Sequence, residues 1–222
     1  NMARNSSDIK MDILDHLARD SRLESDKIKV EFCNGVAVLS GSVHSLAAKD
    51  AAESGCWAVS GVSGVENQLD VVFPEAYKRP SDEAIRESVE QLLRWDPDIY
   101  LQKISMFVSE GRVVLEGVVD KLWKKIRAEQ LASSAGGVVT VTNKITVALT
   151  AQISDEKIGQ EIISTIHRNR ILNINSISVE VINSRVILSG TVPNRVVFDT
   201  IEDIARYTAG VSSIENRMAI SS

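Results

Sequence analysis

The chain has 222 residues, of which 44% are hydrophobic and 25% charged, a composition that excludes a disordered protein and allows several apolar cores. Its formal net charge of -5 argues against non-specific binding of nucleic acid, because neutralising phosphates requires an excess of lysine and arginine. No apolar run approaches the ~18 residues of a membrane-spanning helix, so we expect a peripheral contact with a membrane at most.

The first residues of the chain bear on its location. No apolar stretch follows Arg4, so these residues lack the pattern of a secretory signal peptide. Met2 is typical of a native initiator. We therefore expect a cytoplasmic protein if Met2 is the native start, and a periplasmic one if a leader has been removed.

A helix is predicted at the start of each of three segments, which open with Ser7-Asp8, Ser81-Asp82 and Ser154-Asp155. Serine accepts hydrogen bonds from the free amides of a helix start, and the acid that follows suits the helix dipole. Apolar residues then recur at helical spacing in the second and third segments, at Ile85, Val89, Leu92, Leu93 and at Ile158, Ile162, Ile163, Ile166.

A hairpin of two strands is predicted next in each segment. The first strand alternates apolar and polar residues, with apolar ones at Ile28, Val30, Phe32, at Ile104, Met106, Val108, and at Ile177, Val179, Val181. Tight turns follow at Asn34-Gly35, Glu110-Gly111 and Asn183-Ser184. The second strand is apolar on both faces, which predicts a position in the middle of the sheet.

A second helix and a last strand complete each segment. The helices are predicted over residues 44–59, 121–135 and 194–209, each closed by a glycine suited to a left-handed cap, at Gly61, Gly137 and Gly210. The last strands are predicted over residues 65–72, 139–147 and 214–220. The order is therefore helix, strand, strand, helix, strand, three times over.

The three segments are copies of one unit. Gly41, Gly61 and Asn67 recur 76 residues later as Gly117, Gly137 and Asn143, and these recur 73 residues later as Gly190, Gly210 and Asn216. The Ser-Asp pair recurs after 74 and 73 residues, which predicts that the first copy lacks two residues before Gly41. The glycines at 41, 117 and 190 each end a strand, where a positive φ or a close backbone approach predicts a structural role.

The fold class that follows is α+β, with three tandem αββαβ units over residues 6–73, 80–149 and 153–221. The hairpin makes the first two strands antiparallel and the helical crossover makes the last two parallel. Each unit is then a small mixed three-stranded sheet with both helices on one face. The linkers, Phe73 to Pro80 and Thr150 to Ile153, are short.

The repeated motif resembles the BON domain, a family named for bacterial osmotic-stress and nodulation proteins. The resemblance rests on Ser-Asp, on Trp95-Asp96-Pro97 at the end of a first helix, on Gly35-Val-Ala-Val-Leu-Ser-Gly41, and on Gly-Val followed by asparagine. It covers residues 6 to 221 and is greatest to leaderless members with three tandem copies. It implies the αββαβ fold and attachment to phospholipid or to the cell envelope, often under osmotic stress.

The residues predict neither catalysis nor a bound cofactor or metal. His16, His44 and His167 stand far apart, and the chain has no metal-ligand spacing, nucleophile motif or glycine-rich phosphate loop. Cys33 and Cys56 are too few for a disulfide framework and are expected to be buried as small apolar residues. We therefore expect a protein that is not an enzyme.

One helix start carries the candidate binding residues. Lys121, Lys124 and Lys125 share a helix face, Arg127 flanks it, and Trp123 suits the boundary between water and lipid headgroups. We expect them to form a positive patch that binds anionic phospholipid or a protein partner. The alternative is a solvated helix whose long side chains cover their own core.

Two hypotheses of function follow. The first is a non-enzymatic, stress- or envelope-associated binding module that contacts anionic phospholipid or a membrane-associated partner. The second is a protein-scaffolding or chaperone-like array that uses the outer faces of its sheets. Val38, Val114 and Ile187 would be exposed there, so we expect at least two of the three faces to be covered by a neighbouring unit or by a second chain in a homo-oligomer.

Overall fold

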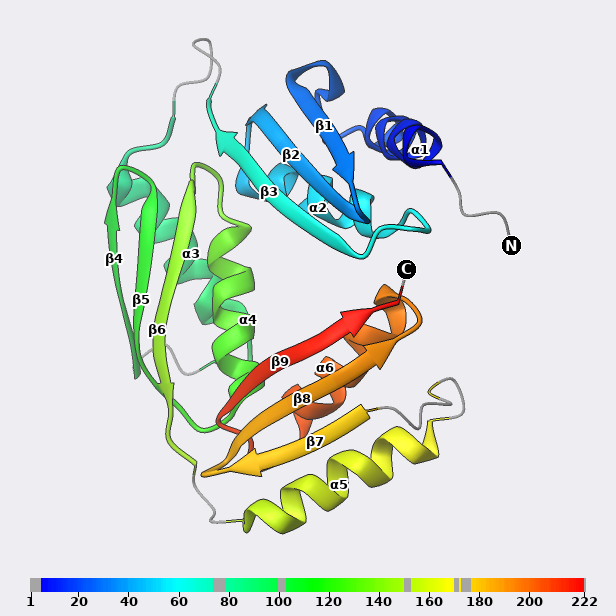
Figure 1. Cartoon of the computed structure of the whole chain (residues 1–222). Helices are drawn as coiled ribbons and strands as arrows, with labels where there is room; N and C mark the ends of the chain where they lie inside the picture. Colours follow the sequence, from blue (N-terminus) through cyan, green and yellow to red (C-terminus); the bar gives the residue numbers. More distant parts are fainter. Residues whose placement is uncertain are drawn as a thin grey trace.

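The computed structural model of the chain describes residues 5–73, 79–99, 103–149, 153–169, 172 and 177–221. These residues form three consecutive units of one helix, two strands, a second helix and a third strand (Figure 1). The predicted α+β fold of three αββαβ units is therefore confirmed. Residues 74–78 and 150–152 of the predicted linkers, and Met2, lie outside the described residues.

The three units repeat the same order of elements. The first unit has α1 (Ser6–Arg19), the short turn η1 (Ser25–Lys27), β1 (Ile28–Cys33), β2 (Val36–Val43), α2 (Leu46–Trp57) and β3 (Gly64–Val71). The second has α3 (Asp82–Trp95), β4 (Ile104–Ser109), β5 (Arg112–Val119), α4 (Leu122–Ser133) and β6 (Thr140–Val147). The third has α5 (Asp155–Arg168), β7 (Ile177–Ile182), β8 (Arg185–Val192), α6 (Arg195–Tyr207) and β9 (Ser213–Ile220).

Each sheet has its second strand in the middle, as predicted. β1 pairs with β2 antiparallel and β2 pairs with β3 parallel, and the other two sheets repeat this order. The two helices cover one face and enclose a separate apolar core. In the first unit, Ile9, Ile13 and Leu17 of α1 lie one turn apart and belong to the same buried cluster as Val30 and Leu39 of the sheet.

The start of the first helix shows that the first unit is complete. α1 is capped by Asn5, whose side chain accepts from the Ser7 amide, so Ser7-Asp8 lies inside the helix. Asn5 precedes Ser81, the cap of α3, by 76 residues, which is the offset found for the glycines. The predicted loss of two residues in the first unit is therefore wrong, because Ser7-Asp8 is not the counterpart of Ser81-Asp82.

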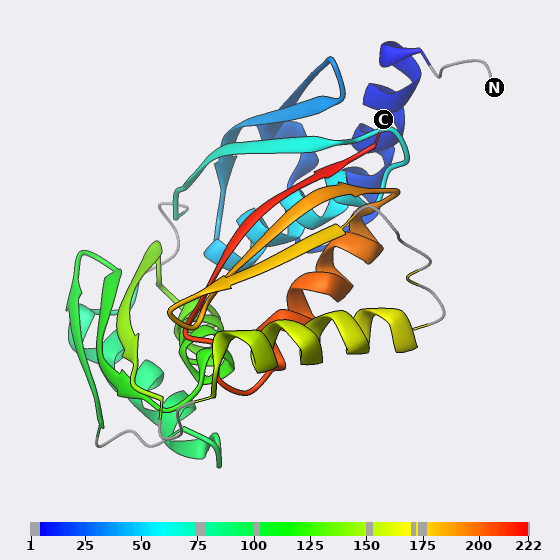
Figure 2. The same ribbon diagram turned by 60° about the horizontal axis from the view of Figure 1, so that its bottom comes forward.

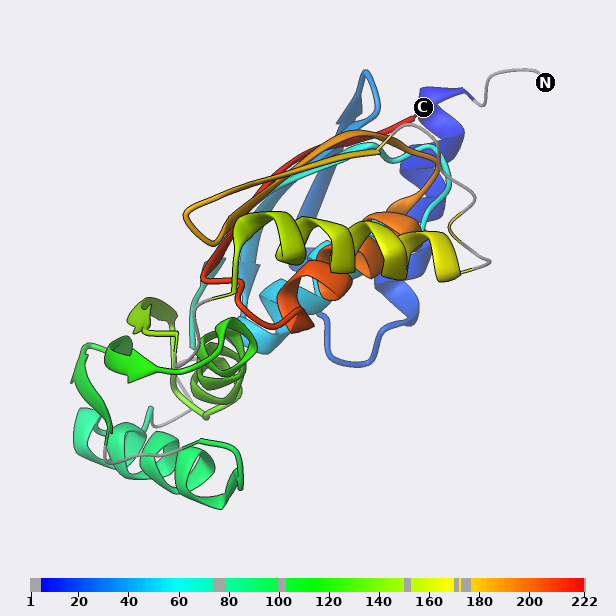
Figure 3. The same ribbon diagram turned by 90° about the horizontal axis from the view of Figure 1, so that it is seen from below.

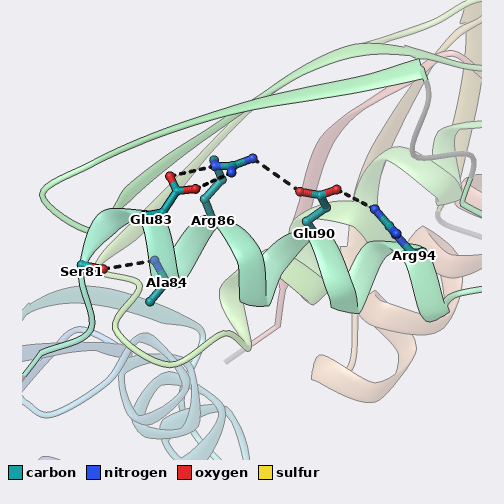
Figure 4. Close-up of polar contacts among 6 residues, drawn as sticks. All are labelled: Ser81, Glu83, Ala84, Arg86, Glu90 and Arg94. Carbon is teal, nitrogen blue, oxygen red and sulfur yellow. Dashed lines mark hydrogen bonds and ion pairs between the residues drawn. The ribbon is translucent and has the colours of Figure 1, made fainter.

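The helix α3 illustrates how these first helices are stabilised. The Ser81 side chain accepts from the Ala84 amide at 3.2 Å, as the predicted cap requires. Along the solvent side, Arg86 lies between Glu83 and Glu90, and Glu90 also binds Arg94 (Figure 4). These ion pairs span one helical turn each and stabilise the helix by a few tenths of a kcal/mol at most per pair.

The glycines at 41, 117 and 190 lie inside β2, β5 and β8, two residues before the strand ends and not at its end. Their φ angles are +116°, +149° and +129°. A Cβ at Gly41 would lie 2.1 Å from the carbonyl oxygen of Lys27, and one at Gly117 would lie 2.1 Å from that of Lys103. Glycine therefore lets the chain entering the first strand cross close to the middle strand.

The glycines at 61, 137 and 210 lie in the turn between the second helix and the last strand, with φ of +102°, +89° and +90°. The second helices end three or four residues earlier, so these glycines are not the helix caps that the sequence suggested. A Cβ at Gly61 would lie 2.7 Å from Cδ1 of Ile9, and one at Gly210 would lie 2.9 Å from Cδ1 of Ile158. The glycines therefore allow the first helix to pack on this turn.

A carboxylate of the first helix holds the hairpin turn in two units. Asp82 accepts from the amides of Glu110 and Gly111 at 2.8 and 2.9 Å, and Asp155 accepts from those of Asn183-Ser184 at 2.7 and 2.9 Å. Both turns place a non-glycine residue at positive φ. The first unit has Asn34-Gly35, the pair that such turns favour, and a serine at the carboxylate position. The aspartate therefore holds the turn in the two units whose turn sequence is less favourable than Asn-Gly.

Replacing Asp82 with asparagine should remove an acid-sensitive contribution to stability. The amides of Gly111 and Glu110 hold the pKa of Asp82 below its ordinary value of 3.8. Because the folded-state pKa is lowered, this contribution is present above the unfolded pKa and is lost as the pH falls through the folded pKa. Asp82→Asn should therefore lower the Tm near neutral pH, and the difference from wild type should shrink in acid. Glu87→Gln, on the exposed side of the same helix, is the control. A Tm difference that does not change with pH would contradict the role of the carboxylate.

The second helices join the three units into a ring. Leu46, the first residue of α2, packs on the core of the second unit, and Leu122, the first residue of α4, is buried in that of the third. The equivalent first residue of α6, Arg195, lies over the Trp57 ring of the first unit, 4.5 Å from its centre. Because this third contact returns to the first unit, the ring is closed. Figures 1 and 3 show α2, α4 and α6 toward the centre, with α1, α3 and α5 outside.

The two cysteines have different surroundings. Cys56 is fully buried in the first core, and burial raises the pKa of its thiol to about 12. Cys33 is exposed, because alternate residues of β1 face the helices from Ile28 onward and Cys33 falls on the other face. The expectation of burial is therefore wrong for Cys33.

The outer faces of the sheets carry no cover from a neighbouring unit among the described residues, whereas cover by a second chain stays a prediction. Val38, Val114 and Ile187 are half-buried. None of them belongs to the apolar clusters formed by the described residues, although those clusters include the contacts between units. Figure 2 shows the sheets of the first and third units on the upper side of the molecule, with α5 and α6 below the sheet of the third unit. Within the described part of a single chain, the predicted cover by a neighbouring unit is absent.

Candidate functional site

The predicted basic residues lie at the start of α4 but do not share one open surface. Lys121 occupies the N-cap position of the helix without a capping side-chain bond and is exposed, and Lys125 is half-buried. Lys124 is only 8% exposed and its Nζ lies 2.9 Å from Oδ1 of Asp120. Hydrogen bonding from Lys124 lowers the pKa of Asp120. The charge of Lys124 is therefore paired within its own unit.

The repeat explains why Lys124 is buried. Ala48 of α2 and Val197 of α6 occupy the same position as Lys124 and are buried as well. This position faces inward in all three second helices, so the lysine stem lies over its own core. Comparing the three units at offsets of 76 and 73 residues would have shown this, whereas helical spacing within one unit did not.

Trp123 is directed toward the third unit. Its ring lies 6.4 Å from that of Tyr207 at the end of α6, with the two planes at 32°. A pocket of about 480 Å³ opens between α4 and α6, and it is lined by Trp123, Ile126, Arg127, Gln130, Arg206 and Tyr207. The structure thus places the predicted tryptophan and arginine on the boundary between two units.

Arg127 connects this pocket to the end of α3. Its Nε donates to Oδ2 of Asp96 at 2.9 Å, and Asp96 directly follows α3. Trp95, the last residue of α3, is 78% exposed, and Tyr207 is 65% exposed. We call Trp95, Trp123, Arg127, Arg206 and Tyr207 the junction site. It combines large aromatic surfaces with two guanidinium groups.

The acids around the junction site reduce its positive charge. Asp96 binds Arg127, and the Arg206 guanidinium lies 2.9 Å from Glu202 and 2.8 Å from Asp203 of its own helix. Arg127 binds Asp96 through Nε, and no bond from its terminal nitrogens is found among the described residues. Within the described part of the chain, these nitrogens are the part of the Arg127 guanidinium that is not bonded to a carboxylate.

Sequence reasoning missed Trp95, Arg206 and Tyr207 as parts of the site. Trp95 was noted only as part of the family motif, and Tyr207 lies in another unit than Trp123. A usable signal was that the aromatic residues at Trp123 and Tyr207 are not repeated, since the equivalent positions hold alanine, valine or serine. Residues that break an internal repeat are candidates for a role that only one unit has.

The remaining reactive side chains have structural surroundings. His16 and His167 are exposed on α1 and α5. His44 contacts the carbonyl oxygen of Val72 at 3.1 Å and a carboxylate oxygen of Glu24 at 2.6 Å, so it connects η1 to the end of β3. No group of three potential metal ligands occurs among the described residues. None of the described helices is both long and apolar enough to cross a bilayer.

The fold defines a class of protein, namely a tandem array of small α+β domains closed into a ring by their second helices. Residues 5–72, 81–148 and 154–222 each match the BON domain, and the chain belongs to this family. The resemblance found in the sequence is thereby confirmed. Domains of this family are associated with binding at membranes and cell envelopes and are generally not enzymes.

The chain is also similar to two solved structures of CdsD, a structural protein of the type III secretion system of Chlamydia trachomatis. The first is 19% identical, covers 96% of this chain and 92% of its own, and has a TM-score of 0.27. The second, the C-terminal domain of CdsD, is 18% identical, covers 99% of this chain and 100% of its own, and also has a TM-score of 0.27. Among curated proteins, no sequence matches the chain.

Proposed function

We propose that the chain is a non-enzymatic, envelope-associated binding protein that contacts membranes containing anionic phospholipid through the junction site. The exposure of Tyr207, which lines a pocket with Arg127, and of Trp95, which precedes the Asp96 bound to Arg127, carries this proposal. Tryptophan and tyrosine favour the headgroup region of a bilayer, where an apolar ring and a polar edge are both satisfied. Arginine complements them because its planar guanidinium binds a phosphate through two hydrogen bonds.

The charges at the site set the expected strength of binding. A lysine or arginine near an anionic surface contributes about 1 kcal/mol. Lys121 is exposed and is expected to contribute fully, whereas Asp120 offsets Lys124 and Asp96 partly offsets Arg127. Together, Lys121, Lys124, Lys125 and Arg127 therefore contribute less than four times this free energy. The aromatic residues supply the rest, and they make binding only partly sensitive to salt.

Sedimentation with lipid vesicles tests the proposal. The full chain should sediment with vesicles that contain phosphatidylglycerol and much less with neutral vesicles. Trp95→Ala with Tyr207→Ala should weaken binding about tenfold or more, since both rings leave the interface. Lys121→Glu with Lys125→Glu should have a similar effect that added salt reproduces, because salt screens exposed charges.

A matched control lies in the first unit. Met11 is 64% exposed on α1, and Lys29 is exposed on β1. Met11→Ala with Lys29→Glu removes one exposed apolar side chain and reverses one charge away from the junction site, so this variant should bind vesicles as wild type does. Vesicle binding that changes neither with the aromatic pair of substitutions, nor with the lysine pair, nor with added salt would refute the proposal.

A second candidate function is protein scaffolding in the same cellular setting. The closed ring supports it, because contacts of Leu46, Leu122 and Arg195 fix the three outer sheet faces relative to one another. Fixed spacing of several surfaces is what a scaffold requires. A wild-type chain that stays in the supernatant with every vesicle composition would favour this function over membrane binding.

A further inference from the structure

The open faces of the three sheets differ in one row of residues. In the first and third units, an aliphatic residue of the middle strand is flanked by glutamate on both neighbouring strands, as Glu31–Val38–Glu66 and Glu180–Ile187–Glu215. In the second unit, the same row is Phe107–Val114–Thr142. Only the second unit therefore has an uncharged row across the centre of its open face.

The apolar part of this face is accessible. Phe107 is 64% exposed and pairs with the half-buried Val114 on the side away from the helices. Val118, 44% exposed, lies on the same face four residues further along β5. Thr142 and Thr146 of β6 continue the face and are exposed. β-branched and aromatic residues in this arrangement suit packing against another sheet about 10 Å away.

The charged residues of this face are complementary to those of an identical face on a second copy. By alternation along the described strands, its charged residues are Arg112, Glu116 and Lys144. Glu116 and Lys144 are paired across β5 and β6, 3.3 Å apart, and are 57% and 61% exposed. In a two-fold assembly, the Glu116 of one copy can lie opposite the Lys144 of the other, and the apolar rows then meet as well.

We propose that this face, formed by Phe107, Val114, Glu116, Val118, Thr142 and Lys144, joins two copies of the chain. On the first unit, Glu31 and Glu66 would place like charges against an identical face. On the third unit, Glu215 is paired with Arg185 and Arg217, and Glu180 stands where the second unit has Phe107, so that face lacks the uncharged row. One self-complementary face per chain gives a closed dimer and not a filament. The proposal is independent of the junction site, whose residues lie on α4 and at the ends of α3 and α6.

Sedimentation equilibrium of the full chain tests the dimer. The wild type should be dimeric at micromolar concentration. Phe107→Glu with Thr142→Glu gives the second unit the row that the first and third units carry, so the sheet should fold as they do. The two glutamates should raise the dimer dissociation constant at least ~100-fold, because unpaired charges would be buried in the interface.

Charge exchange provides the second measurement. Glu116→Lys alone should weaken the dimer, and adding Lys144→Glu should restore it, because the exchanged pair is again self-complementary. A monomeric wild type, or a double glutamate variant that dimerises as wild type does, would overturn the proposal. If the wild type is monomeric and the Phe107→Glu variant does not bind vesicles, the face contacts lipid and not a second chain, which would also overturn the proposal.

Discussion

Gly117→Ala should lower the free energy of unfolding of the second unit by about 3 kcal/mol. The φ of Gly117 is +149°, a conformation that residues with a side chain rarely adopt. A Cβ there would lie 2.1 Å from the carbonyl oxygen of Lys103. The obstacle is a backbone atom and not the end of a flexible side chain, so relief requires β4 to move away from β5.

Urea-induced unfolding followed by tryptophan fluorescence is a suitable measurement, since Trp95 and Trp123 both lie in the second unit. Gly136→Ala is the control in the same unit, because a Cβ at Gly136 would have no neighbour within 4 Å. That substitution should change stability little or raise it slightly by restricting the unfolded chain. Similar unfolding curves for the two variants would show that the close approach to Lys103 is not important for stability.

Much of the fold could be predicted because its signals are local. Alternation in β1, the tight turn at Asn34-Gly35 and the helical spacing of Ile85 and Val89 each reflect contacts within one unit. Offsets shared by glycines that are far apart in each unit then established the repeat. The error at Ser7-Asp8 arose because a good capping sequence also occurs inside a helix, where the cap is supplied by Asn5 two residues earlier.

The ring and the junction site could not be predicted, because they depend on residues that differ between units. Leu46, Leu122 and Arg195 hold the same position but make apolar contacts in two cases and a cation–π contact in the third. Trp123 meets Tyr207 only because the end of α6 lies beside the start of α4. Neither relation leaves a periodic pattern in the sequence.

The recurring asparagine of the last strand was predicted only as a marker of the repeat, but it connects that strand to the second helix. In the second unit, the Asn143 side chain donates to the carbonyl oxygen of Lys125 at 2.8 Å and to the Glu129 carboxylate at 3.0 Å. It also accepts from the Ile145 amide at 3.1 Å. Asn67 makes the same three kinds of bond in the first unit. One side chain therefore fixes α4 on β6.

Asn143→Asp should destabilise the second unit by about 3 kcal/mol near neutral pH, because two donors are lost and a carboxylate faces Glu129 at hydrogen-bond distance. Two carboxylates this close cannot both remain ionised without cost, so the pKa of the pair should rise in the folded variant. Because that folded-state pKa is raised, the penalty is present above it and is relieved as the pH falls and one proton is shared. The Tm of Asn143→Asp should therefore rise toward that of wild type on mild acidification. Asn143→Ala removes the same bonds without adding a charge, so its deficit in Tm should not change over this range. Equal pH dependence of the two variants would show that Asn143 does not hold Glu129 at this distance in solution.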